Sequence, residues 1–412
     1  MPALIVALEV GTSKVVALVG EKREDGHIMI TGMGEYPSSG LRKGEVIDYE
    51  NAVVCTRGAI QAAEESGRVN IRQVYLAVSG GHIQSLTNRG ITPVRGPAQE
   101  ITQEDVDSVM DIAGSISLPH DREVLHSLCK HFGVDDQERV ANPVGLEGAR
   151  LCVDMLILHG VRNLLRNTVK VVRGLQVDVA DVAFAGLCSA LAVVTPEQKR
   201  SGVLVIDLGG GTTDYFAYAD NVVATAGCLG IGGDHVTNDI ALAFNIPISQ
   251  AEGLKRRSGS ALIDPLVMSK RVKIPAEMGF TGRSVSVKAL HSVMNARLSE
   301  TFHLIRAETE ERGVLHQFGG GVILTGGGAH MSGIVELAEK ELGLPCTIGK
   351  PLHVSGLSAV RDRPQYASVV GMVEYGFRTM GEDQGVSIVP PWVKGLFKAR
   401  AREERPGGSR NR

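Results

Sequence analysis

Three acidic side chains stand beside glycine turns that follow short apolar runs. Asp207 comes just before a turn at residues 209–212 and Asp214 just after it, while Glu9 precedes a turn at residues 11–14. A glycine turn lets backbone N–H groups approach an anion, because no Cβ intervenes. A carboxylate at the end of the preceding strand can hold a hydrated Mg²⁺. The spacing therefore predicts a site for nucleotide phosphates and magnesium.

The three acids are the candidate catalytic residues, with different expected roles. We predict that Asp207 binds Mg²⁺ through water and that Asp214 orients its turn or an attacking water. Glu9 is the symmetric acid beside the other turn. Simpler interpretations stay open, since Asp214 alone suits a turn cap and each glycine turn suits an ordinary hairpin. Neither turn is a Walker A loop, because no GxxxxGK[ST] occurs.

Further glycines and one charged pair complete the predicted nucleotide site. A third glycine loop, at residues 326–328, follows an apolar run and suits close contact with adenine and ribose. Glu252 and Lys255 are three residues apart on a predicted helix, so they share a face; a solvated ion pair is the alternative. The candidate cofactor-binding residues are Gly11, Thr12, Ser13, Lys14, Gly209, Gly210, Gly211, Thr212, Gly232, Gly233, Glu252, Lys255, Gly326, Gly327 and Gly328.

An internal repeat indicates how these turns are positioned. Residues 7–12 and 205–212 both read as strand, acid, apolar residue and glycine turn leading into a second strand. Two copies of one unit predict two similar lobes with the ligand between them, although chance similarity is the alternative for so short a match. Predicted strands and helices alternate, which favours an α/β architecture. Strands are expected at 4–8, 15–19, 74–78, 151–158, 203–207, 215–218 and 322–324, and helices at 103–113, 163–173, 250–257, 287–310 and 333–342.

Composition narrows the possible partners. The chain has 412 residues and a formal charge of −3, enough for two or three domains and no basis for a nucleic-acid binder. The beginning of the sequence lacks the basic region of a signal peptide. The longest apolar run, at residues 182–194, is too short to span a bilayer. Any membrane contact is therefore expected to be peripheral.

The last residues predict such a contact. At 100° per residue, Trp392, Val393, Leu396 and Phe397 share an apolar arc, and Lys394 and Lys398 lie on the opposite arc. Residues 392–412 hold seven Lys or Arg and two Glu, a net charge of +5. This pattern is typical of an amphipathic helix lying on anionic lipid. A helix that docks on the protein body is the alternative.

These motifs resemble a known family. The sequences around Glu9 and Asp207 look like the two phosphate motifs of the actin, hexokinase and heat-shock chaperone superfamily, and Thr325-Gly326-Gly327-Gly328 looks like its adenosine motif. Within that superfamily the chain is most similar to FtsA over about residues 3–402. Several stretches look specific to FtsA, namely residues 142–146, 184–190, 236–244 and 251–255.

The resemblance implies an actin-like (ribonuclease H-like) two-lobed fold with an inserted FtsA-type subdomain and a C-terminal amphipathic helix. It implies small-residue helices where the lobes hinge. The implied domains are a first lobe (1–83, 163–195 and 356–385), an insert (84–162), a second lobe (196–229 and 312–355), an outer subdomain (230–311) and a linker with the membrane helix (386–412). Glu9 stands where actins carry Asp, so we expect ATP binding with at most slow hydrolysis.

The resemblance also implies partners and a location. FtsA-like proteins polymerise and tether the FtsZ ring to the cytoplasmic face of the bacterial inner membrane at the division septum, among other divisome proteins. The helix bearing Asn295, Arg297 and Glu300 resembles the region that receives the FtsZ C-terminal peptide. Two rivals stay open at this point: a PilM-like assembly protein and a small-molecule kinase of the same superfamily. A chaperone-type ATPase is not expected, because the residues after the nucleotide-binding fold are too few for its peptide-binding domain.

Overall fold

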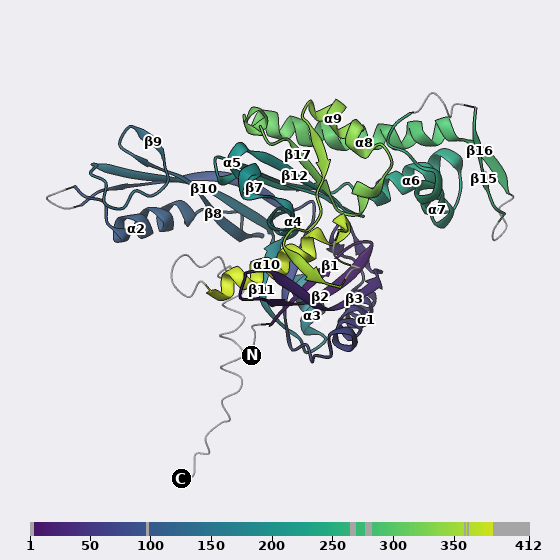
Figure 1. The fold of residues 1–412 in the computed structure, drawn as a ribbon, viewed down its shortest axis with the longest axis horizontal. Helices are drawn as coiled ribbons and strands as arrows, with labels where there is room; N and C mark the ends of the chain where they lie inside the picture. Colours follow the sequence, from purple (N-terminus) through teal and green to yellow (C-terminus); the bar gives the residue numbers. More distant parts are fainter. Residues whose placement is uncertain are drawn as a thin grey trace, which may run out of the picture.

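Two mixed β-sheets lie at the centre of the computed structural model, which describes residues 4–95, 99–263, 269–276, 282–357, 360 and 362–381 (Figure 1). The strands of the first sheet are β1 Leu4–Val10, β2 Lys14–Lys22, β3 Ile28–Pro37, β6 Gln73–Val78, β11 Asp178–Phe184 and β19 Val354–Gly356. Those of the second are β12 Val203–Leu208, β13 Thr213–Ala219, β14 Val222–Leu229, β17 Val322–Thr325 and β18 Cys346–Ile348. Two strands, β4 Leu41–Arg42 and β5 Glu45–Val46, form a separate hairpin.

The two sheets share one topology, which confirms the predicted repeat. The first runs in the order β11–β6–β1–β2–β3–β19 and the second in the order β14–β13–β12–β17–β18. In each, an antiparallel meander of three strands continues into parallel strands: β1 pairs with β6, and β12 pairs with β17. The chain therefore builds two lobes from the same plan, as the actin-like prediction requires.

The turns are tighter than the sequence suggested. We expected Glu9 to lie in the connection between two strands, but β1 extends to Val10 and pairs Glu9 with Val16 and Val10 with Val15. In the second lobe Asp207 and Asp214 are direct cross-strand partners. All three acids therefore stand on regular strands, whose pairing fixes their positions.

Helices cover both lobes and join them. Helix α4 Ala185–Val193 packs against α10 Ala367–Gly381, and α10 also contacts β1, β2 and β6. A Cβ on Gly371 of α10 would lie 1.7 Å from the Cys188 carbonyl oxygen of α4, so only glycine permits this approach. The two lobes also contain α1 Tyr49–Gly67, α3 Arg162–Arg173, α5 Pro196–Ser201 and α9 Ile334–Leu342, with short 3₁₀ turns at Leu315–Gln317, Gly327–His330 and Pro364–Tyr366.

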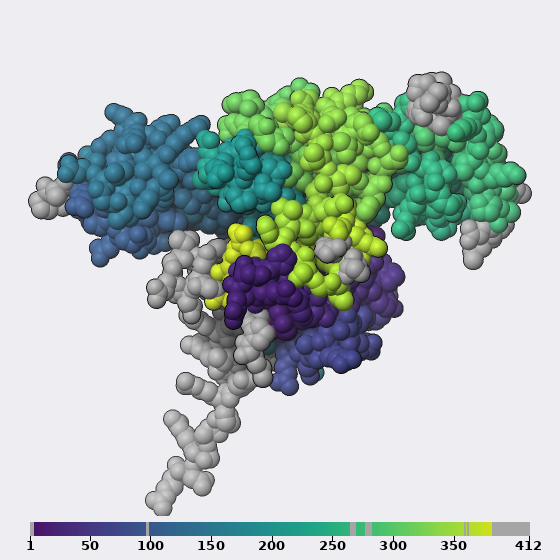
Figure 2. All heavy atoms as spheres, viewed as in Figure 1, coloured from purple at the N-terminus to yellow at the C-terminus, as the bar shows by residue number. Residues whose placement is uncertain are grey.

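A third sheet forms the insert at one end of the molecule (Figures 1 and 2). Its strands are β7 Gln84–Pro93, β8 Arg122–Val134, β9 Gln137–Val140 and β10 Arg150–Val161, and α2 Gln103–Gly114 packs on it. The helix predicted at 103–113 and the strand predicted at 151–158 are both present, as α2 and β10. The sequence missed β7, β8 and β9, because β8, with half-buried Lys and His side chains, carries no clear alternation of apolar and polar residues. The insert has its own apolar core around Val109, Leu151 and Val153.

The outer part of the second lobe lies at the opposite end (Figure 2). It contains α6 Gly233–Phe244, α7 Ile248–Ser258, α8 Val287–Glu311 and the hairpin β15 Arg271–Ile274 with β16 Arg283–Ser286. The predicted membrane helix, with Trp392, Val393, Lys394, Leu396, Phe397 and Lys398, lies outside the described residues. Within the described ranges, every helix is too short or too polar to cross a bilayer.

Candidate functional site

The two glycine turns meet between the lobes. Residues 11–14, here the first turn, connect β1 to β2; residues 209–212, here the second turn, connect β12 to β13. A Cβ built on Gly210 would lie 2.9 Å from the Ser13 Cβ, and one built on Gly211 would lie 2.4 Å from the Thr12 hydroxyl oxygen. The structure thus brings together turns that are about 200 residues apart in the sequence, as the repeat predicted.

Both turns leave backbone N–H groups unused. The Gly11 N–H donates to the Lys14 carbonyl (3.1 Å), and the Gly209 N–H donates to the Thr212 carbonyl (2.9 Å), which closes each hairpin. In the described part of the chain, no hydrogen bond uses the N–H groups of Gly210 and Gly211. Free amides without Cβ atoms beside them make a suitable cradle for phosphate oxygens.

The acids of the second lobe are buried next to each other. Burial raises the pKa of Asp207 to about 8, and the negative charges of Asp214 and Glu9 raise it further. Burial likewise raises the pKa of Asp214 to about 7, although hydrogen bonds from Cys228 and Ser79 oppose the shift. Burial also raises the pKa of Glu9, against the Ser368 hydroxyl and the Lys14 charge. Three carboxyl groups in this arrangement favour a nearby cation.

A serine hydroxyl holds each of these acids, a feature that sequence analysis missed. Ser368 of α10 donates to Glu9 Oε2 (2.7 Å), and Ser189 of α4 donates to Asp207 Oδ2. Ser79, which follows β6 in the first lobe, donates to Asp214 Oδ1 (2.7 Å) and lies 3.0 Å from the Thr212 hydroxyl. Ser79 therefore reaches across from the first lobe to the second turn.

The third glycine loop closes another side of the site. Gly326 has a φ of +81°, and a Cβ there would lie 2.2 Å from Asp207 Oδ1, so the residue must be glycine. A Cβ on Gly328 would lie 2.6 Å from that of Leu208. A Cβ on Gly327, by contrast, would meet no atom within 4 Å. The loop is thus fixed beside Asp207 at two glycines and open at the one between them.

Gly232 and Gly233 support the second turn from behind, rather than offering free amides. At the start of α6, the Gly233 N–H donates to the Gly209 carbonyl (2.9 Å) and the Asp234 N–H to the Gly210 carbonyl (2.8 Å). The Gly232 N–H donates to His235 Nδ1 (3.1 Å). These bonds fix the second turn, so its shape depends on the helix that follows it.

Glu252 and Lys255 of α7 lie together beside the start of α6. Lys255 Nζ is 2.6 Å from Glu252 Oε2 and donates to the Gly233 carbonyl (3.0 Å). The Thr237 hydroxyl donates to Glu252 Oε2 (2.6 Å). Burial raises the pKa of Glu252, but the Lys255 and Thr237 bonds outweigh burial and lower it, so the carboxylate stays charged. The predicted pair therefore contacts Gly233, the residue whose N–H group holds the second turn.

The Lys14 side chain is paired with residues of the first lobe. Its Nζ lies 3.0 Å from Glu35 Oε2 and 3.9 Å from the ring centroid of Tyr366, whose hydroxyl donates to Glu35 (2.8 Å). The ammonium group is thus already paired. The part of the first turn left for a ligand consists of its backbone and the Thr12 and Ser13 side chains; the Thr12 hydroxyl accepts a bond from the Gly44 N–H (3.0 Å).

The three predicted partner-binding residues do not share one face of α8. Arg297 forms two bonds to Asp239 of α6 (2.6 and 3.2 Å) and one to Glu300 (2.5 Å). Asn295 instead donates to the Ala261 carbonyl (2.7 Å). The structure brings Arg297 and Glu300 together but turns Asn295 towards the loop after α7.

Magnesium fits this site only with help from its ligand. In the described ranges, no three His, Cys, Asp or Glu side chains are arranged to hold a metal ion. Mg²⁺ keeps several waters and is usually shared between one or two carboxylates and phosphate oxygens. Asp207, on its strand end beside the second turn, suits a bond through water. Sequence motifs identified the turns and acids, whereas the serines carry no such signal.

Comparisons with known proteins give one consistent answer. A family model for "Cell division protein FtsA" matches residues 204–371, and one for "SHS2 domain inserted in FTSA" matches residues 80–159. The cell division protein FtsA of Pseudomonas aeruginosa is 36% identical over 93% of this chain and 92% of its own length. That of Escherichia coli K12 is 36% identical over 95% of this chain and 96% of its own length.

Solved structures share the fold at low identity. A PilM–PilN type IV pilus biogenesis complex contains a chain with a TM-score of 0.63 and 16% identity, covering 91% of this chain and 99% of that one. MreB5 of Spiroplasma citri bound to ADP has a TM-score of 0.53 and 14% identity, covering 92% of this chain and 99% of that one. These likenesses establish an actin-like fold, and the sequence relatives are far closer than the PilM chain.

Proposed function

This chain belongs to the FtsA family of cell division proteins, and we propose that it binds ATP with Mg²⁺ between its two lobes. The observation that carries the proposal is the contact of the two turns, with Ser13 against Gly210 and Thr12 against Gly211. Terminal phosphates would bind the free amides of Gly210 and Gly211, and Asp207 would hold Mg²⁺ through water. Adenosine would lie against Gly327, where the third loop is open.

A nucleotide-binding assay tests this assignment. The full chain is titrated with a fluorescent ATP analogue with Mg²⁺, and the Gly327→Leu variant is compared with it. Because a Cβ at Gly327 meets no neighbour, the variant should fold normally while its side chain occupies the space expected for adenosine. We expect at least about tenfold weaker binding, or about 1.4 kcal/mol. Gly114, equally open but at the end of α2 in the insert, provides the control variant Gly114→Leu.

Two results would contradict the assignment. One is a wild-type chain with no affinity for the analogue in the presence of Mg²⁺. The other is a Gly327→Leu variant that binds as tightly as Gly114→Leu. We further propose that turnover is at most slow, since Glu9, Asp207 and Asp214 are each held by a serine.

We propose that residues 386–412 carry the membrane anchor at the cytoplasmic face of the inner membrane. The apolar arc of Trp392 and its neighbours, with the +5 charge of residues 392–412, supports this. One such helix binds reversibly, and a filament that presents many helices binds far more tightly through effective concentration. ATP would then gate attachment by favouring polymerisation.

Vesicle sedimentation tests the anchor. Full chain and a version lacking residues 391–412 are mixed with anionic and with neutral liposomes, with and without ATP. The full chain should sediment with anionic vesicles and the truncated chain should stay in solution. Undiminished sedimentation of the truncated chain would place the lipid contact elsewhere.

We also propose that the second lobe's α8 region receives the C-terminal peptide of FtsZ, so that the chain tethers the FtsZ ring at the septum. Arg297 is already bonded to Asp239 and Glu300, so an acidic peptide must share or displace these partners. Arg297→Glu should abolish peptide binding measured by fluorescence anisotropy. Asp239→Asn, which frees Arg297 from its main partner, should strengthen it; equal affinities in all three proteins would contradict this site.

The domain boundaries predicted from the sequence form part of the proposal. An insert at 84–162 accords with the four strands from Gln84 to Val161. An outer subdomain at 230–311 accords with α6, α7 and α8. The PilM-like alternative is less favoured, because likeness to the PilM chain rests on 16% identity against 36% for the cell division relatives.

A further inference from the structure

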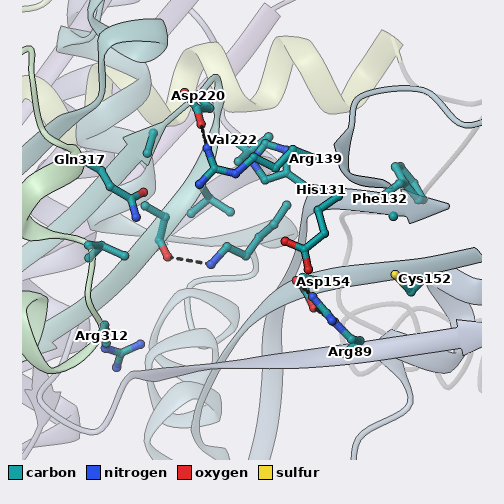
Figure 3. A pocket seen from close by; sticks show the side chains of 17 residues that line it. Arg89, His131, Phe132, Arg139, Cys152, Asp154, Asp220, Val222, Arg312 and Gln317 are labelled. Carbon is teal, nitrogen blue, oxygen red and sulfur yellow. Dashed lines mark hydrogen bonds and ion pairs between the residues drawn. The ribbon is translucent and has the colours of Figure 1, made fainter. Parts of the chain in front are cut away.

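A charged cavity of about 270 Å³ lies where the insert meets the second lobe, away from the paired turns (Figure 3). Its walls come from β7, β8, β9 and β10 of the insert, from β14 and the turn before it, and from the end of α8. None of the residues that line it belongs to the predicted nucleotide, peptide or membrane sites. The cavity is thus independent of the function proposed above.

Hydrogen bonds and an ion pair between the insert and the second lobe surround the cavity. Lys130 of β8 donates to the Ala224 carbonyl of β14 (3.2 Å). Arg139 of β9 is paired with Asp220 in the turn before β14 (2.7 Å), as Figure 3 shows. Arg312, which follows α8, donates to the Ser85 hydroxyl of β7 (3.0 Å). A molecule in this space therefore touches the insert and the second lobe at once.

The lining carries two cations that form no ion pair among the described residues. Arg139 is paired with Asp220, and Arg89 makes two bonds to Asp154 (2.7 and 2.8 Å) on the opposite side from Arg312 in Figure 3. The other two cations, Lys130 and Arg312, donate only to carbonyl and hydroxyl oxygens in the described part of the chain.

The charges of Lys130 and Arg312 are close enough to affect each other. Burial lowers the pKa of Lys130, and the Arg312 charge lowers it further against the opposite effect of Asp154. Burial, with Arg139 and Lys130 nearby, also lowers the pKa of His131, so this ring adds no charge at neutral pH. Glu138, on exposed β9, is the one lining acid outside the two ion pairs. Two cations without an ion-pair partner within the described ranges thus line the same space, together with one unpaired carboxylate.

We propose that this cavity binds a small phosphorylated anion between Lys130 and Arg312, bridging the insert and the second lobe. The size fits, because a water takes about 30 Å³ of liquid volume and a cavity of about 270 Å³ has room for a di- or triphosphate group. Both cations keep unused N–H donors: Lys130 donates one of its three and Arg312 two of its five. A bound anion replaces repulsion between the two cations by attraction to both, which fixes the insert on the second lobe.

Calorimetry on the full chain tests the proposal with inorganic pyrophosphate as the probe. The protein is first saturated with ADP and Mg²⁺, so that the paired turns are occupied. Lys130→Gln and Arg312→Gln should each weaken pyrophosphate binding by at least about tenfold, because each removes a charge-assisted bond. Glu138→Gln should strengthen it severalfold, since it removes the opposing carboxylate. Lys288→Gln, at an exposed lysine of α8, should bind like the wild type.

Conservative variants separate loss of charge from loss of fold. Lys130→Arg and Arg312→Lys keep a cation in place and should retain binding within about threefold. Unchanged affinity in Lys130→Gln and Arg312→Gln would overturn the proposal. So would weaker binding in Glu138→Gln, or a loss in Lys130→Arg as large as in Lys130→Gln, because the site requires the charge and not one particular side chain.

Discussion

The first and second turns are built on the same hairpin but contribute different chemistry. The second turn has three consecutive glycines, free amides and two buried acids on either side of it. The first turn has one glycine, two hydroxyl side chains, a half-buried acid and a lysine that is already paired with Glu35. In the proposed function, the second lobe would therefore supply both the main-chain cradle for phosphate and the charge for Mg²⁺.

The comparison indicates that the second lobe should contribute more to nucleotide affinity than the first. In the second lobe, the turn is supported by the N–H groups of Gly233 and Asp234 and by the buried Asp207–Asp214 pair. The first lobe reaches it through Thr12, Ser13 and Ser79. We therefore expect substitutions in the second turn to be costly and equivalent ones in the first lobe to be milder.

The largest expected effect comes from filling the space between the turns. In Gly211→Val, the new side chain would start 2.4 Å from Thr12 Oγ1 and 2.9 Å from the Lys43 backbone nitrogen. Overpacking of this kind costs about 1–3 kcal/mol, which corresponds to roughly 5- to 150-fold weaker ATP binding. Titration with the fluorescent ATP analogue measures it. Gly114→Ala, in the insert, where a Cβ meets no atom within 4 Å, is the control, and equal losses in the two variants would remove the distinction between them.

The next largest effect is the dependence of stability on pH that the buried Asp207 should cause. Without ligand, the folded chain holds the Asp207 proton more tightly than the unfolded chain, because its pKa is raised from 3.8 to about 8. The free energy of unfolding of the wild type should therefore fall as pH rises from about 4 to 8. Asp207→Asn cannot ionise, so it should melt several degrees above the wild type at pH 8, in EDTA and without nucleotide, yet bind ATP with Mg²⁺ more weakly.

The corresponding first-lobe exchange sharpens this result. Glu9 is only half-buried, so Glu9→Gln should raise the melting temperature at pH 8 by less than Asp207→Asn does. Scanning calorimetry between pH 5 and 8.5 provides the measurement. A wild-type melting temperature that does not change over this range would show that Asp207 is ionised in the folded chain and would contradict the comparison.

A smaller effect distinguishes the serines. Ser79 joins the two lobes through Asp214, whereas Ser368 holds Glu9 within the first lobe. Removing one hydrogen bond costs about 1 kcal/mol, so Ser79→Ala should weaken ATP binding about three- to tenfold. Ser368→Ala should change it by less than about twofold, because the bond that it loses does not cross between lobes. A larger loss in Ser368→Ala would mean that Glu9, and not Asp214, is the acid coupled to the nucleotide.

The turns were predictable from the sequence because their signals are local. An acid, an apolar residue and one or more glycines within eight positions define each hairpin, and repetition of that unit predicted two lobes. The ends of the strands were predicted less well. The pairing of Val10 with Val15 extends β1 beyond the apolar run that predicts it.

The rest of the site depends on contacts between distant segments. Ser79 and Asp214 are 135 residues apart, and Ser368 and Glu9 are 359 apart, so no spacing in the sequence predicts these bonds. Gly233 illustrates the same limit, since nothing in its spacing predicts that its N–H donates to the Gly209 carbonyl. Ligand contact by Gly232 and Gly233 stays a prediction. Within the insert, β8 was missed because it mixes Lys and His with apolar residues, and the apolar core that it joins forms only within the folded sheet.

The smallest expected effect concerns the length of the acid in the first lobe. Glu9→Asp shortens the side chain by one methylene and withdraws the carboxylate from the Ser368 hydroxyl, 2.7 Å away in the wild type. Loss of that bond should lower the free energy of unfolding by about 0.5–1.5 kcal/mol, measured by urea denaturation. ATP affinity should change by less than about threefold, because the second turn keeps its amides and Asp207. A tenfold loss of affinity in Glu9→Asp, with Ser368→Ala unaffected, would show that the first-lobe acid contacts the magnesium–phosphate group as directly as Asp207 does, and the two hairpins would then be equivalent.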